Sequence, residues 1–224
     1  MEEIRKTFAQ EINELKQSVM DIGMMSVELI QGALKALVER DTALADEIIK
    51  ADEKIDEKSL EIEENCLKLL ALQQPMAIDL RLISGVWKIN TDIERLADHT
   101  TKIARKAAIL APLKQIKPYE DLPKMAAKTV EMLKSSLDAF MNLDAIKANE
   151  IIAMDDEIDE YNHKIFAELV SIMNKDASSI NYVSHLMSVV ASFERIGDHV
   201  TNICERIVFI KTGILPKSDW RLYY

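Results

Sequence analysis

Apolar residues recur at helical spacing along most of the chain, and no segment shows the sustained alternation of a strand. Residues 83–107 illustrate the pattern, with Ile83, Val86, Ile93, Ala97, Ala104 and Ala107 on one stripe. Residues that begin or end helices interrupt the pattern at Asp41, Pro75, "APLKQIKPYEDLP" (111–123), Asp144 and "NKDASSINY" (174–182). The pattern therefore predicts helices at about 4–39, 42–71, 76–110, 120–142, 145–174 and 180–212.

The chain also contains an internal repeat. "VERDTALADEIIKADEKID" (38–56) matches "MNLDAIKANEIIAMDDEID" (141–159) at an offset of 103, and "IERLADHTTKIA" (93–104) returns as "FERIGDHVTNIC" (193–204) at an offset of 100. Short connections make sequential helices antiparallel neighbours. We therefore predict an all-α fold of two tandem three-helix bundles related by the repeat. The predicted domains are 1–112 and 113–224, the second with a C-terminal tail that contains Trp220, Tyr223 and Tyr224.

Composition and charge narrow the classes of function. The formal net charge is −10, whereas binding to nucleic acid needs clustered positive charge, so we expect no nucleic-acid partner. No apolar run approaches the roughly 18 residues that a membrane helix needs, and the N-terminal segment is charged throughout, so we expect no signal peptide and no membrane insertion. Cys66 and Cys204 lie within helical patterns without metal-type spacing, which favours two buried thiols in a reducing cytoplasm.

Each copy of the repeat contains two pairs of acidic residues four positions apart. The pairs are Asp52/Asp56 and Glu94/Asp98 in the first copy, and Asp155/Asp159 and Glu194/Asp198 in the second. Like charges at this spacing destabilise a helix by about 0.2–0.5 kcal/mol per pair, so their repetition calls for a reason.

The positions of these pairs supply one. Within the first copy the two pairs are equidistant from Pro75, and within the second they are equidistant from the segment "NKDASS". Antiparallel helices joined by a short turn bring equidistant residues level, and neighbouring axes lie about 8–10 Å apart. Four carboxylates can bridge that gap around a hard cation such as Mg, Ca, Mn, Fe or Zn. We therefore expect one metal site in each copy.

Two other interpretations remain open from the residues. The acids could be solvated helix faces of a purely structural helical scaffold. A ferritin-like di-metal carboxylate oxidase would need a Glu-x-x-His on each of two helices, but the chain has only Glu160 to His163, without a partner in the first copy. His99 and His199 directly follow an acid, which is the wrong register for this site. Each is a group that supports the metal ligands, a group that faces a partner, or an ordinary surface histidine. Since no nucleophile triad, phosphate loop or cysteine cluster is present, we expect no enzyme.

Two stretches resemble a known family. "QQPMAIDLRLISGVWKINTDIERLADHTTKIA" and "HLMSVVASFERIGDHVTNICERI" are similar to the two repeat signatures of the PhoU family of phosphate-uptake regulators, and the resemblance extends over nearly the full chain. Ile78 departs from the pattern, because the family usually has Gly before "DLR".

The resemblance implies a cytoplasmic, often homodimeric protein of two three-helix bundles. It also implies Fe, Zn, Mn or Mg ions, alone or in multinuclear clusters, held by motifs that match the eight acids above. Members repress the phosphate-starvation response by coupling the phosphate ABC transporter to a sensor histidine kinase, as adaptors rather than catalysts.

Overall fold

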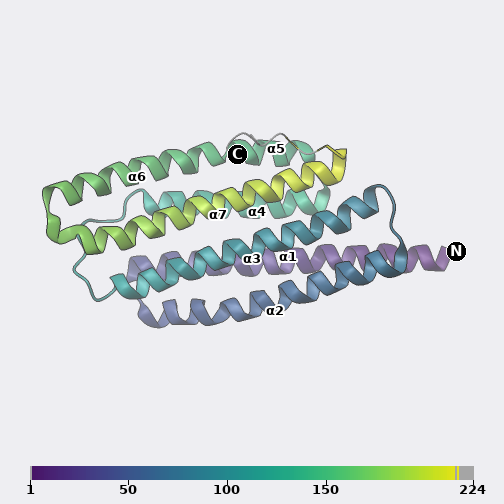
Figure 1. The fold of residues 1–224 in the computed structure, drawn as a ribbon, viewed down its shortest axis with the longest axis horizontal. Coiled ribbons are helices and arrows are strands. Elements are labelled where there is room, and N and C mark those ends of the chain that lie inside the picture. The colour runs from purple at the N-terminus through teal and green to yellow at the C-terminus, as the bar shows by residue number, and fades with distance from the viewer. Residues whose placement is uncertain (1, 215, 217–224) are drawn as a thin grey trace.

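The computed structural model describes residues 2–214 and 216, and its secondary structure is helical (Figure 1). The helices are α1 (Glu2–Glu39), α2 (Thr42–Gln73), α3 (Ile78–Leu110), α4 (Leu122–Asn142), α5 (Ala145–Ala153), α6 (Asp155–Lys175), the short 3₁₀ turn η1 (Ala177–Ser179) and α7 (Ile180–Thr212). The prediction of an all-α fold is confirmed. The aromatic residues of the C-terminal tail lie outside the described residues.

Local side-chain chemistry places the helix ends where the sequence predicted them. The Leu44 N–H donates to the carboxylate of Asp41 at 3.0 Å, and Asp144 accepts in the same way from the N–H groups of Ile146 and Lys147. Such caps satisfy backbone donors that have no partner inside the helix. At the other end of the chain, Gly213 adopts a positive φ of 76° and terminates α7.

The helix predicted at 145–174 differs, because it breaks at Met154 into α5 and α6. The Met154 N–H donates to the Ile151 carbonyl at 2.9 Å, which closes a tighter turn than an α-helix has. Three acids occupy the first turn of α6, where the helix dipole favours negative charge. Asp155 is therefore the first residue of α6, whereas its counterpart Asp52 lies inside the continuous helix α2.

The helices form two units, which we call the first unit (α1–α3) and the second unit (α4–α7). Helices α3 and α7 lie side by side and antiparallel at the centre of the molecule (Figure 1). Arg81 near the start of α3 donates from Nε to the Ile210 carbonyl near the end of α7 at 3.1 Å. At the opposite ends, Lys106 Nζ lies 3.4 Å from His185 Nδ1.

This contact joins the two units into one structure. Their buried apolar residues form a single continuous core. The predicted boundary between residues 112 and 113 falls in the connection between α3 and α4, and the division into two domains stays a prediction.

Two further expectations concern burial and membranes. Cys66 and Cys204 are free and buried, as predicted, and burial raises the pKa of each thiol to about 12. Within the described part of the chain, none of the helices combines the length and the apolar character that crossing a bilayer requires.

Candidate metal centres

The first centre consists of Asp52 and Asp56 on α2 with Glu94 and Asp98 on α3. These two helices pack against each other, and the acids influence one another across the contact. Burial raises the pKa of Asp52, and repulsion from Asp56 and Asp98 raises it further. Burial likewise raises the pKa of Glu94, with the same two carboxylates adding to the shift. The level placement predicted from Pro75 thus brings acids of both helices into one electrostatic cluster.

The second centre consists of Asp155 and Asp159 on α6 with Glu194 and Asp198 on α7. Burial, followed by repulsion from Asp159 and Asp198, raises the pKa of Asp155 to about 7. Burial also raises the pKa values of Glu194 and Asp198. All four acids of this centre interact, so the repeat in the sequence is also a repeat of the electrostatic arrangement.

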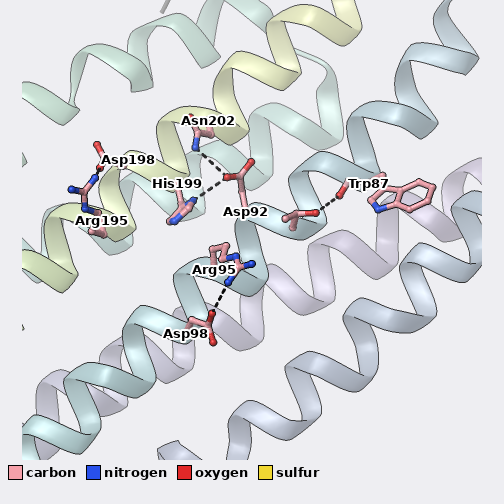
Figure 2. Close-up of polar contacts among 9 residues, drawn as sticks. Trp87, Asp92, Arg95, Asp98, Arg195, Asp198, His199 and Asn202 are labelled. Atoms are coloured by element: carbon pink, nitrogen blue, oxygen red, sulfur yellow. Dashed lines mark hydrogen bonds and ion pairs between the residues drawn. The ribbon is translucent and has the colours of Figure 1, made fainter. Parts of the chain in front are cut away.

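An arginine accompanies each centre in the same way. Arg95 Nη1 lies 3.4 Å from Asp98 Oδ2, and Arg195 Nη1 lies 3.0 Å from Asp198 Oδ2 (Figure 2). Both arginine side chains are 58% exposed and both aspartates 42% exposed. Because exposed ion pairs contribute little, these arginines only partly offset the repulsion among the acids.

The donor chemistry of both centres is that of a hard-cation site. As the side chains stand, no three Asp, Glu, His or Cys residues of the described chain form a set that could hold a metal ion. The carboxylate oxygens are nevertheless the ligands that Mg²⁺, Mn²⁺ or Fe prefer. Coordination by these residues therefore requires the carboxylates to move closer together.

Two hydroxyl groups fit the same interpretation. Thr101 is only 4% exposed, and its Oγ1 atom has no hydrogen-bond partner. Thr201, its counterpart in the second unit, also buries an unpartnered Oγ1. Each hydroxyl is close enough to lower the pKa of the first acid of its centre, Asp52 or Asp155, without reaching hydrogen-bond geometry. A buried polar atom without a partner costs free energy. In both centres, a hydroxyl oxygen beside the acids is therefore available as a ligand for a cation.

The histidines that follow the acids lie between the two units. The ring centroids of His99 and His199 are 5.8 Å apart. His199 Nδ1 lies 2.9 Å from Asp92 Oδ1, which also accepts from Asn202 Nδ2 at 3.1 Å (Figure 2). Burial, together with nearby cations, lowers the pKa of His99 to about 4. His99 and His199 are both half-buried in the contact between α3 and α7, so neither is an ordinary surface histidine. Asp92 was not foreseen, because the repeat has Ser192 at the equivalent position.

Comparison with known proteins decides the family. The PhoU domain matches residues 19–107 and 122–207. The chain belongs to the PhoU family, as its two signatures predicted. A PhoU relative from Clostridium acetobutylicum, named phosphate-specific transport system accessory protein PhoU homolog, is 38% identical over 210 residues, covering 93% of this chain and 96% of the relative. A homolog of the same name from Aquifex aeolicus is 35% identical over 210 residues, covering 94% and 95%.

Solved PhoU structures share the fold. The phosphate transport system regulatory protein PhoU from Streptococcus pneumoniae superposes with a TM-score of 0.87 at 33% identity, covering 93% of this chain and 99% of that one. PhoU from Pseudomonas aeruginosa gives a TM-score of 0.89 at 30% identity, covering 92% and 100%.

The geometry disfavours the oxidase alternative. Glu160 and His163 are both exposed on α6, whereas a ferritin-like di-metal site needs these residues to project into the bundle. The PhoU relatives described above are named as accessory or regulatory proteins rather than as enzymes.

Proposed function

We propose that this chain is an accessory regulator of phosphate transport that binds a metal ion in each of its two units. Membership of the PhoU family and the names of the relatives support the regulatory part. We further propose that the protein is a cytoplasmic, homodimeric adaptor, without catalytic activity. It would restrain phosphate uptake and the phosphate-starvation response by coupling the phosphate ABC transporter to a sensor histidine kinase.

One observation carries the metal part, namely that acids from two helices cluster in both units. Burial and mutual repulsion raise the pKa of an acid on each helix of both clusters. Bound metal would supply the positive charge that such clusters lack. Asp52, Asp56, Glu94 and Asp98 would hold it in the first unit, and Asp155, Asp159, Glu194 and Asp198 in the second.

Each bound cation would connect two helices of its unit. Asp56 comes from α2 and Glu94 from α3, so sharing one cation ties these two helices together. Asp159 and Glu194 would tie α6 to α7 in the same way. Since α3 and α7 pack against each other, a shift of either helix reaches the other unit. This connection suits an adaptor, because metal binding in one unit would also affect the other unit.

Thermal melting of chelator-treated protein tests the metal part. We expect Mn²⁺, Fe²⁺, Zn²⁺ or Mg²⁺, added singly, to raise the melting temperature, because a ligand at a hundredfold excess over its Kd stabilises the folded state by about 2.7 kcal/mol. The variant Glu94→Gln/Asp98→Asn should lose one equivalent of bound metal.

The matched control is Glu57→Gln/Glu61→Gln, which removes an exposed acid pair of the same spacing on α2. It should keep both equivalents. If no metal raises the melting temperature of the parent, the acids are a solvated face and the metal part is wrong.

A phosphate-starvation reporter in the source organism tests the regulatory part. Deleting the gene should switch the reporter on at high phosphate, and the parent gene should restore repression. The variant Asp98→Asn/Asp198→Asn, which alters both centres, should fail to do so. A deletion without effect would contradict the regulatory role, and full repression by the variant would show that the metal is dispensable for it.

A further inference from the structure

The two centres differ at one position on the helix that carries the second acid pair. Gly197 on α7 stands where the first unit has Ala97 on α3. A Cβ atom added to Gly197 would lie 2.7 Å from Asp155 Oδ1 and 3.1 Å from Ile158 Cδ1. Carbon and oxygen atoms that are not bonded do not approach so closely. The carboxylate of Asp155 therefore occupies the space that a side chain at 197 would fill.

The first unit has no such space at the equivalent position. The methyl group of Ala97 is present there, and the residue is only 1% exposed. At this position of the repeat, α3 consequently has one more carbon atom than α7. The space at Gly197 is a property of the second unit alone.

The backbone reinforces this difference. Asp155 follows directly after the break at Met154 and is the first residue of α6, whereas Asp52 lies inside α2. In the second unit, therefore, a helix that restarts at the acid faces a helix that lacks a side chain opposite it. Both features act on the same carboxylate.

Electrostatics follow the geometry. The carboxylate of Asp155 is partly buried, and Asp159, Asp198 and Glu194 are its acidic neighbours. The carboxylate is thus partly removed from water and gathered with three other acids. Oxygen donors that are already desolvated and gathered lose less on binding a cation, and their charges act more strongly on it.

We propose that Gly197 makes the two centres unequal, so that the second unit binds a divalent cation more tightly than the first. This inference rests on the proposed metal binding and adds its order of loading. Asp155 is the ligand that distinguishes the centres, because its carboxylate can lie against α7 only where residue 197 lacks a side chain. Gly197 itself is a positioning residue, because it contributes no donor atom.

Calorimetric titration of the metal-free protein with Mn²⁺ tests this. The parent should show a tighter and a weaker site, and Asp155→Asn should remove the tighter one. Gly197→Ala should weaken the tighter site by about 10- to 100-fold, the usual effect of disturbing a group that orients a metal ligand, and should leave the weaker site unchanged. The reverse exchange, Ala97→Gly, should strengthen the weaker site.

Gly32→Ala is the matched control. A Cβ at Gly32 would lie 2.5 Å from Ile48 Cδ1, a comparable clash against an apolar side chain. This variant should change folding stability but neither affinity. Circular dichroism verifies that each variant is folded, and Ala97→Gly decides the question alone if Gly197→Ala does not fold.

The possible failures are distinguishable. Two equal sites in the parent, an unchanged tighter site in Gly197→Ala, or an unchanged weaker site in Ala97→Gly would each overturn this inference and leave the proposed metal binding intact. Absence of Mn²⁺ binding by the parent would overturn both.

Discussion

His199 Nδ1 on α7 lies 2.9 Å from Asp92 Oδ1 on α3, and this contact links the two units near the middle of the molecule (Figure 2). The two side chains are 20% and 16% exposed. Asn202 donates to the same carboxylate oxygen at 3.1 Å. Asp92 is thus an acceptor that two groups of the second unit share, and it has no counterpart in the repeat.

Removing this acceptor should weaken the contact between the units. Asp92→Ala leaves His199 and Asn202 without their common partner, so we expect the free energy of unfolding to fall by about 1–3 kcal/mol. Urea denaturation measures the change. Asn202→Ala is the control and should cost less, because the Asn202 side chain is exposed. Equal stability of Asp92→Ala and the parent would refute the prediction.

The raised pKa of Asp155 predicts a pH dependence of the metal-free protein. The folded-state pKa of about 7 lies above the ordinary value of 3.8, so the stability that this group contributes is fully present below 3.8 and is lost as the pH rises through 7. Asp155→Asn cannot ionise. Its advantage in melting temperature over the parent should therefore grow between about pH 5 and about pH 8.

The measurement is thermal melting in chelator at both pH values, with Asp156→Asn as the control for removing an exposed charge next to Asp155. A difference in melting temperature between Asp155→Asn and the parent that stays constant with pH would show that ionisation of Asp155 does not destabilise the folded protein.

The lowered pKa of His99 predicts a pH dependence of folding stability with the opposite sign. Burial, Lys102 and His199 lower its pKa from 6.5 to about 4, while Asp98 opposes the shift. The stability contributed by neutral His99 is present above 6.5 and is lost as the pH falls through 4. His99→Gln should consequently lose less stability than the parent as the solution is acidified over this range. Parallel urea denaturation of the two proteins checks this, and identical acid sensitivity would contradict it.

The turn between α2 and α3 contains a strained residue that can be relieved. Gln74 has a φ of 46°, a left-handed conformation that disfavours residues with a Cβ atom, and its side chain is exposed. We expect Gln74→Gly to raise the free energy of unfolding by about 0.5–1 kcal/mol, after the entropy that glycine adds to the unfolded chain.

Leu143, with a φ of 48°, provides the comparison for that variant. Leu143 packs against the core, so Leu143→Gly should show no such gain. Chemical denaturation of both variants separates backbone strain from lost packing. A loss of stability in Gln74→Gly would refute the prediction.

The sequence predicted the helices and the level placement of the acid pairs because both depend on regular spacing. It did not reveal the break at Met154, since apolar residues continue through it at helical spacing. Periodicity also shows which face of α3 is apolar without showing that α7 covers it, and the contact of Asp92 with His199 was missed for that reason.

Other features were visible but could not be interpreted. Thr101 and Thr201 recur in the repeat, but a threonine in a helix commonly bonds its own backbone, as Thr100 does with the Leu96 carbonyl at 2.9 Å. That their hydroxyls lack partners emerges only from the packing. The presence of Gly197 at the position equivalent to Ala97 was likewise visible in the sequence. Its effect depends on where the Asp155 carboxylate lies, which only the structure shows.

The contact between His99 and His199 also shows how the two units are related to each other. Each residue meets its own equivalent in the other unit, which happens in a symmetric dimer only beside the twofold axis. The two units therefore meet at this contact as the subunits of an isologous dimer do, and residues 111–121 connect them within one chain. In a true dimer every substitution appears twice, at both related places. Within a single chain a substitution appears once, so Asp92 in the first unit and Gly197 in the second can each lack a counterpart while the pairing of His99 with His199 is kept.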